Sequence, residues 1–144
     1  MGTQQVSRST VVAATPQQVF DLVADFRRHP DFDGSGSVKQ GLRGPDRLHL
    51  GAKFGMRMRI GLPYVMVNEV VEFAEPSRIG WQHVNHHVWR YELDPVEHGT
   101  RVTETFDWSH ARMRRPLERF GLVARNVRSL EATLRRLEAI FGTP

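Results

Sequence analysis

The sequence contains no cysteine, and this absence excludes three classes of site at once. Without cysteine there is no disulfide framework, no thiolate ligand for zinc and no cysteine nucleophile. The chain also has no run of about 18 uninterrupted apolar residues, the length that a membrane-spanning helix needs, and residues 1–10 contain no apolar segment of the signal-peptide kind. We therefore expect a cytoplasmic protein with no stable membrane insertion.

Charge of one sign is only slightly in excess. The 144 residues include 20 basic and 16 acidic side chains, for a net charge of +4, and Lys39 and Lys53 are the two lysines among the basic residues. An excess this small does not indicate nucleic-acid binding, and we expect no nucleic-acid partner. With 40% apolar and 25% charged residues the composition is that of a globular protein, and the length suits a single domain over residues 1–144.

The motifs of common cofactor and nucleophile sites are missing as well. There is no Gly-x-Ser-x-Gly element, no phosphate-binding loop and no dinucleotide fingerprint. His83, His86 and His87 lie close together in the sequence, but no cysteine or aspartate nearby completes a set of metal ligands. We expect no cofactor and no metal ion.

The first quarter of the chain predicts a strand followed by two short helices. Gln4–Ala13 is rich in Val, Ser and Thr, as in a strand. Thr15–Gln18 has the residues of a capping box, with proline at the first helical position. We expect Arg27–Phe32 to form a second helical turn, broken at Pro30, and Asp33–Ser37 to form a loop.

The middle of the chain predicts antiparallel strands. Every even position in Leu48–Ile60 is apolar, which predicts one half-buried strand, and Pro63–Phe73 is the strand that returns. A two-residue turn at Gly61-Leu62 pairs Met56 with Val67 and turns the odd positions of the returning strand inward. Three more segments alternate in the same way: Ile79–His83, His87–Leu93 and Val102–Trp108.

A long helix is predicted at the end of the chain. From Met113 to Phe141 the apolar residues are spaced three and four apart, which is typical of an amphipathic helix. The order of elements is α+β: a curved six- to seven-stranded antiparallel sheet wrapped around the long C-terminal helix, with two short helices after the first strand. Because one helix does not fill the volume inside a strongly curved sheet, side chains or a ligand must fill it.

Four segments, together with this order of elements, resemble the START-like (helix-grip) superfamily and its polyketide cyclase/dehydrase and lipid-transport family. The segments are Ala14–Asp25, Val70–Phe73, Trp89–Leu93 and Gly99–Glu104. The resemblance covers nearly the whole chain and implies a helix-grip fold with an internal apolar cavity closed by the long helix. It implies that the protein binds or transports a small hydrophobic molecule, lipid-like or polyketide-like. The alternative is a polyketide aromatase/cyclase that catalyses aldol cyclisation and dehydration.

The inward faces of the predicted strands are rich in aromatic residues and methionine, which suit a permissive apolar pocket but also fill ordinary cores. Glu69 and Glu104 interrupt these faces. An inward carboxylate must be paired, hydrated or protonated, so each either pairs with an arginine, turns outward at a bulge, or serves as a polar anchor. The predicted cavity residues are Phe54, Met56, Met58, Val67, Glu69, Trp81, His83, Trp89, Tyr91, Glu104, Phe106 and Trp108.

The candidates for acid and base chemistry are Glu104, Tyr91 and His83, although no catalytic position of a known cyclase is carried over to them. The basic residues Arg114, Arg115 and Arg119 form a solvated helix face or attract an acyl carrier protein or another anionic partner. The ligand, the oligomeric state and the gate of the cavity, whether Asp33–Ser37 or the turn at Gly61, stay open at this point.

Overall fold

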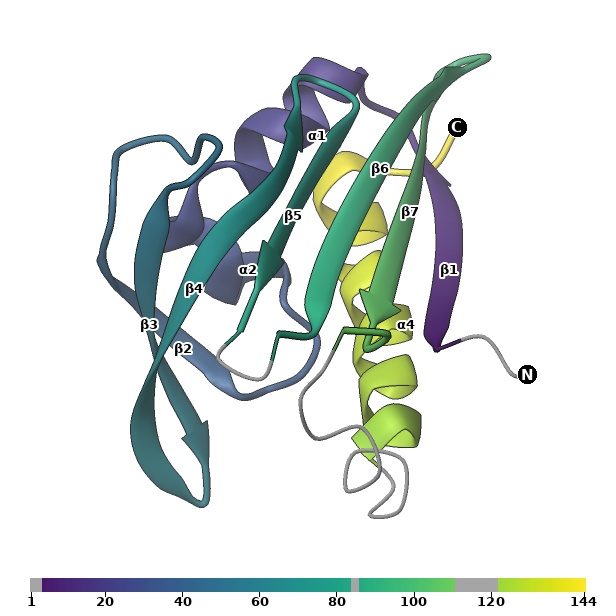
Figure 1. Ribbon diagram of the computed structural model, residues 1–144. Helices are drawn as coiled ribbons and strands as arrows, with labels where there is room; N and C mark the ends of the chain where they lie inside the picture. Colours follow the sequence, from purple (N-terminus) through teal and green to yellow (C-terminus); the bar gives the residue numbers. More distant parts are fainter. Residues whose placement is uncertain (1–3, 84–85, 111–121) are drawn as a thin grey trace.

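The computed structural model describes residues 4–83, 86–110 and 122–144. Within them the strands are β1 (Gln5–Val12), β2 (Val38–Arg43), β3 (Lys53–Ile60), β4 (Leu62–Ala74), β5 (Arg78–Gln82), β6 (Val88–Val96) and β7 (Gly99–Asp107). The helices are α1 (Pro16–Val23), the 3-10 helix η1 (Phe26–Arg28), α2 (His29–Phe32) and α4 (Leu122–Phe141). All seven strands form one antiparallel sheet in the order β1-β7-β6-β5-β4-β3-β2, and the sheet curves around α4 (Figure 1).

The capping box predicted at the start of α1 is confirmed. The Thr15 hydroxyl accepts a hydrogen bond of 3.2 Å from the backbone N–H of Gln18, whose side chain accepts one of 2.8 Å from the N–H of Thr15. The break predicted at Pro30 is wrong, because η1 and α2 follow each other directly and Pro30 occupies the first turn of α2. A proline is tolerated there because the first helical N–H groups have no partner within the helix.

Two boundaries on the β2–β3 side differ from the prediction. The strand expected from Leu48 begins at Lys53, because Leu50 and Gly51 form a turn in which Gly51 has a φ of +83°. Leu48 is nevertheless buried, and its backbone N–H donates a hydrogen bond of 2.8 Å to the carbonyl of Ala24. Strand β2 was not identified as a segment, since two register shifts against β3 disturb its alternation.

The register between β3 and β4 is one residue away from the predicted one. Ile60 pairs with Leu62, so Gly61 alone makes the turn, with a φ of +75°. A shift of one residue exchanges the two faces of a strand. Val67, which is 51% exposed, and Glu69 therefore lie on the outer face, and their predicted place in the cavity is wrong.

Helix α4 covers the concave face of the sheet near β1 and β7, α2 packs beside it, and α1 packs against β6 (Figure 1). Its residues Leu130, Leu134 and Leu137 are buried in the core, as the predicted amphipathic helix requires. The predicted beginning of this helix and the basic residues Arg114, Arg115 and Arg119 lie outside the described residues. No helix in the described part of the chain is long and apolar enough to cross a membrane.

Candidate functional site: a cavity beneath the long helix

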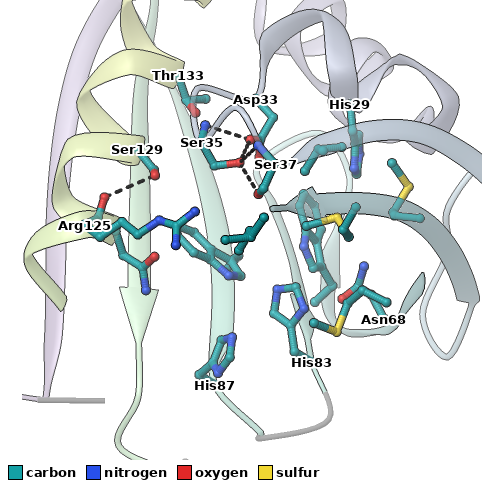
Figure 2. Close-up of a pocket in the computed structure, with 18 of the residues that line it drawn as sticks. His29, Asp33, Ser35, Ser37, Asn68, His83, His87, Arg125, Ser129 and Thr133 are labelled. Carbon is teal, nitrogen blue, oxygen red and sulfur yellow. Dashed lines mark hydrogen bonds between the residues drawn. The ribbon is translucent and has the colours of Figure 1, made fainter. Parts of the chain in front are cut away.

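A cavity of about 310 Å³ lies between the concave face of the sheet and α4. This volume is at the lower end of the roughly 300–1,000 Å³ typical of small-molecule pockets. Figure 2 shows Arg125, Ser129 and Thr133 of α4 on one side of it, with His83 and Asn68 on the other. The sheet contributes a mainly apolar wall: Met56, Met58, Met66, Trp81, Trp89 and Tyr91.

The structure brings most of the predicted cavity residues together. Those that line the cavity are Met56, Met58, Trp81, His83, Trp89, Tyr91 and Glu104. Phe54, Phe106 and Trp108 are buried but do not line it. These three side chains fill the core, which was the alternative to a place in the cavity. The Phe54 ring lies against Trp81 with centroids 5.7 Å apart, and the rings of Phe106 and Trp108 stack at 5.4 Å.

Glu104 and Tyr91 face each other across β7 and β6 and share a hydrogen bond on the cavity side. The Tyr91 hydroxyl donates a hydrogen bond of 3.0 Å to Oε1 of Glu104, and both residues are buried. Burial first, and then the charge of Asp33, raise the pKa of Glu104 well above its usual value. The pKa of Tyr91 is also raised, chiefly by burial. Burial therefore favours the protonated form of Glu104, which has a proton to donate.

Four buried polar atoms around the cavity have no hydrogen-bond partner among the described residues: Asn68 Oδ1, His83 Nδ1, His87 Nδ1 and Glu104 Oε2. All four side chains line the cavity. A buried polar atom without a partner costs about 1–3 kcal/mol, and such atoms in native proteins usually meet water or a ligand. These atoms are therefore the natural contacts for the polar groups of a bound molecule.

His83 and His87 form a pair at the end of the sheet between β5 and β6. Their ring centroids are 4.6 Å apart, and the backbone N–H of His83 donates a hydrogen bond of 3.2 Å to the carbonyl of His87. Burial lowers the pKa of His87 to about 4; burial and the neighbouring His87 lower that of His83 to about 3. Both imidazoles are neutral near pH 7. Among residues 4–83, 86–110 and 122–144, no three histidine or acidic side chains are grouped so that they could hold a metal ion.

His29 is a cavity residue that no pattern in the sequence indicated. Its ring stacks on Trp81 with centroids 4.8 Å apart, and its Nε2 lies 2.8 Å from the carbonyl of Val23. Burial lowers its pKa. Helix α2, which carries His29, has four residues, so no periodicity could have shown which of its side chains point inward.

The loop that precedes β2, which the sequence offered only as a possible gate, contributes to the wall of the cavity. Asp33, Ser35 and Ser37 line the cavity and are joined by hydrogen bonds through the Ser35 hydroxyl. Two hydrogen bonds attach the loop to α4. The backbone N–H of Gly34 donates one of 2.8 Å to the hydroxyl of Thr133. The guanidinium of Arg136 donates one of 2.6 Å to the carbonyl of Asp33.

Helix α4 contributes a polar stripe to the cavity. Arg125, Ser129 and Thr133 are spaced four apart, so they lie above one another on one face of the helix, next to its apolar seam. The Ser129 hydroxyl donates 3.2 Å to the carbonyl of Arg125. This spacing is visible in the sequence and could have identified the helical wall of the cavity.

Comparisons with known proteins agree with this architecture. A family model described as polyketide cyclase / dehydrase and lipid transport matches residues 3–142. The chain is 38% identical over 142 residues to the uncharacterized protein Rv0088 of Mycobacterium tuberculosis. The match covers 94% of this chain and 63% of that protein, so the chain spans less than two thirds of this relative.

Solved structures show the same fold. Protein NE0264 from Nitrosomonas europaea has a TM-score of 0.73 and 17% identity, with 95% of this chain and 93% of that chain covered. Protein CV1439 from Chromobacterium violaceum also has a TM-score of 0.73, with 15% identity and 97% and 99% coverage. These likenesses confirm the α+β helix-grip fold predicted from the sequence.

Proposed function

Because the chain belongs to the polyketide cyclase/dehydrase and lipid transport family, we propose that it binds or carries a small hydrophobic molecule in the cavity beneath α4. The observation that carries this proposal is the combination of an apolar wall with buried polar atoms that lack protein partners among the described residues. Methionine and aromatic side chains contact a flat or flexible apolar body, and a few fixed polar groups orient it.

The size and polarity of the cavity limit the ligand. A volume of about 310 Å³ suits one or two rings or a short chain rather than a two-chain phospholipid. In the protonated form that burial favours, Glu104 donates a hydrogen bond, and Oδ1 of Asn68 accepts one. The ligand is accordingly a small apolar molecule with at least one carbonyl or hydroxyl oxygen.

Native mass spectrometry of the protein purified from its own host tests the proposal. We expect a fraction of the protein to retain a small organic molecule, which denaturation releases and which extraction identifies. Protein carrying Ser129→Phe, which places a ring in the cavity, should lose that mass. A retained mass of equal abundance in both proteins, or an empty wild-type protein that also takes up no oxygenated aromatic compound such as 2-naphthol, would overturn the proposal.

A second candidate, an aromatase/cyclase, is favoured by one specific arrangement. The Glu104 carboxyl, whose pKa is raised by burial and which accepts a hydrogen bond from Tyr91, lines the same cavity as the unprotonated imidazoles of His83 and His87. In an aldol closure a base removes a proton from carbon next to one carbonyl, the carbanion attacks a second carbonyl, and an acid protonates that oxygen. The new carbon–carbon bond closes the ring, and loss of the resulting hydroxyl with a neighbouring hydrogen as water then forms a carbon–carbon double bond. This cavity has residues of both kinds.

Incubation with a linear poly-β-ketone mimic separates the two candidates. Cyclisation above the uncatalysed rate that is lost in Glu104→Gln and in His83→Gln supports the enzyme. Binding of the mimic without faster cyclisation supports the carrier. The amide introduced by Glu104→Gln keeps the shape of the neutral acid but is far too weak an acid to protonate an alkoxide, so binding and chemistry respond differently to this variant.

A further inference from the structure

The outer face of the β3–β4 hairpin carries basic and apolar side chains side by side. Arg57 pairs with Val65 and Arg59 with Pro63, and in the next outward pair Gly55 faces Val67. Arg43 of β2 and Lys53 of β3 extend the basic row, and with Leu42, Val65 and Val67 they border a shallow depression. We call Arg43, Lys53, Arg57, Arg59, Val65 and Val67, with the turn Ile60–Leu62, the hairpin face.

The four basic side chains of the hairpin face are exposed and have no ion-pair partner within the described ranges. Elsewhere on the sheet the pattern is different: Arg90 pairs with Glu72 and Arg78 with Glu92. Glu69 is the acidic residue next to this row, opposite Lys53. In a protein of net charge +4, this local excess makes the hairpin face strongly positive.

The tip of the same hairpin is apolar and extends beyond the body of the molecule (Figure 1). Leu62 is 81% exposed, and Ile60 and Val65 are also exposed. Aliphatic side chains gathered at a protruding turn indicate a contact surface, because their exposure to water is unfavourable and binding would bury them. Because the tip protrudes, a protein partner would need a matching pocket, whereas a lipid surface accepts a protruding tip without one.

We propose that the hairpin face docks on an anionic phospholipid surface, with Ile60 and Leu62 among the acyl chains and Arg57 and Arg59 at the phosphates. Apolar residues at a tip flanked by basic residues are the combination that binds anionic interfaces. Ile60 and Tyr64 are both exposed and line the cavity, so the cavity reaches the surface next to the docked turn. Docking therefore brings its opening to the lipid. This contact does not depend on which ligand the cavity holds.

Co-sedimentation of the full chain with vesicles tests the inference. We expect binding to vesicles of phosphatidylcholine mixed with phosphatidylglycerol, little binding to phosphatidylcholine alone, and weakening as salt is raised. Arg57→Glu should reduce the vesicle affinity at least about fivefold, the effect of one basic residue near an anionic surface. Leu62→Ser should reduce it roughly fivefold through lost apolar contact. Neither side chain is part of the core, so both variants should fold as the wild type does.

Matched variants far from the hairpin provide the controls. Arg101→Glu makes the same charge change at an exposed position at the start of β7, and Ile140→Ser removes an exposed aliphatic side chain near the end of α4. Both should leave vesicle binding unchanged. Equal losses in Arg57→Glu and Arg101→Glu, equal binding to neutral vesicles, or no binding to either vesicle would overturn the proposal. So would a dimer in solution that Leu62→Ser dissociates, because the hairpin face would then be an interface between two copies.

Discussion

Tyr91 and Glu104 lie directly opposite each other on β6 and β7, and the tyrosine hydroxyl donates a hydrogen bond of 3.0 Å to Oε1 of the glutamate inside the cavity. The pairing leaves Oε2 of Glu104 directed to no other described group. An ionised carboxylate would be costly in this position, so burial raises the pKa of Glu104 and favours its protonated form. The consequence is a hydrogen-bond donor in the wall of a mostly apolar cavity.

Replacing Glu104 by glutamine should change how stability depends on pH. The pKa of Glu104 is raised in the folded protein, so between the unfolded pKa of about 4.3 and the folded pKa the folded state binds the extra proton. Stability therefore falls as pH rises through this window, by up to about 1.4 kcal/mol per pH unit. Glu104→Gln has no proton to lose. Urea unfolding from about pH 5 to about pH 7 should show the variant gaining stability relative to wild type, and parallel pH profiles would contradict this.

His83 and His87 should produce the opposite slope. Their pKa values of about 3 and about 4 lie below the unfolded value of about 6.5, so the unfolded chain binds more protons between these limits. The contribution of the two histidines to the free energy of unfolding therefore has its full value above about pH 6.5. It decreases as the pH falls, by up to about 1.4 kcal/mol per pH unit for each histidine. The double variant His83→Gln/His87→Gln should flatten the unfolding free energy between about pH 6.5 and about pH 4.5.

The exposed His98 offers a control for this experiment. His98→Gln should leave the acid slope as it is in the wild type, while a slope that survives the double variant unchanged would remove both histidines as its cause. Some slope should remain, because burial also lowers the pKa of His29.

The register of β4 can be tested with two matched substitutions on one strand. Val70 is buried and Val67 is 51% exposed. Threonine has nearly the shape of valine, so Val70→Thr buries a hydroxyl and should lower the free energy of unfolding by about 1–3 kcal/mol. Val67→Thr should change it by less than about 0.5 kcal/mol. Chemical denaturation of both variants measures the difference. The reverse order would support the register predicted from the sequence, in which the odd positions face inward.

That register shows where sequence patterns stop being informative. The prediction of the register depended on the alternation of apolar and polar residues, and this alternation correctly identified the cores of β6 and β7. The capping box of α1 was also correctly predicted, from its residue types. Both faces of β4 are apolar, however: Val65 and Val67 on one, Met66 and Val70 on the other. Alternation alone could not choose between them, and the choice depended on whether the turn has one residue or two. The observed pairing of Ile60 with Leu62 decides it, since it leaves Gly61 alone in the turn.

The candidate site was predictable in proportion to how much of it comes from regular strands. Inward positions such as Met56, Trp81 and Tyr91 followed from the period of two. His29 and Asp33 belong to a four-residue helix and a loop, which have no period. Two hydrogen bonds hold the loop against α4: Thr133 accepts one from the N–H of Gly34, and Arg136 donates one to the carbonyl of Asp33. Such contacts between residues about 100 positions apart depend on the assembled fold.

Filling the cavity should abolish binding with little change in stability. Ser129 lies on the side of α4 that lines the cavity, and its side chain is buried. In Ser129→Phe the added ring occupies space that the protein leaves empty, so it should exclude a ligand without displacing packed core atoms. Fluorescence of 1-anilinonaphthalene-8-sulfonate, together with the melting temperature, measures the two effects.

The control for this variant is Ala124→Phe, which adds the same ring to the same helix at an exposed position. We expect dye binding to be lost in Ser129→Phe and retained in Ala124→Phe, with melting temperatures within about 4 °C of wild type, the shift that corresponds to roughly 1 kcal/mol in a chain of this length. A dye signal that falls equally in both variants would mean that the dye binds the helix surface. A signal that persists in Ser129→Phe at an unchanged melting temperature would mean that the space beneath α4 is not where apolar molecules bind.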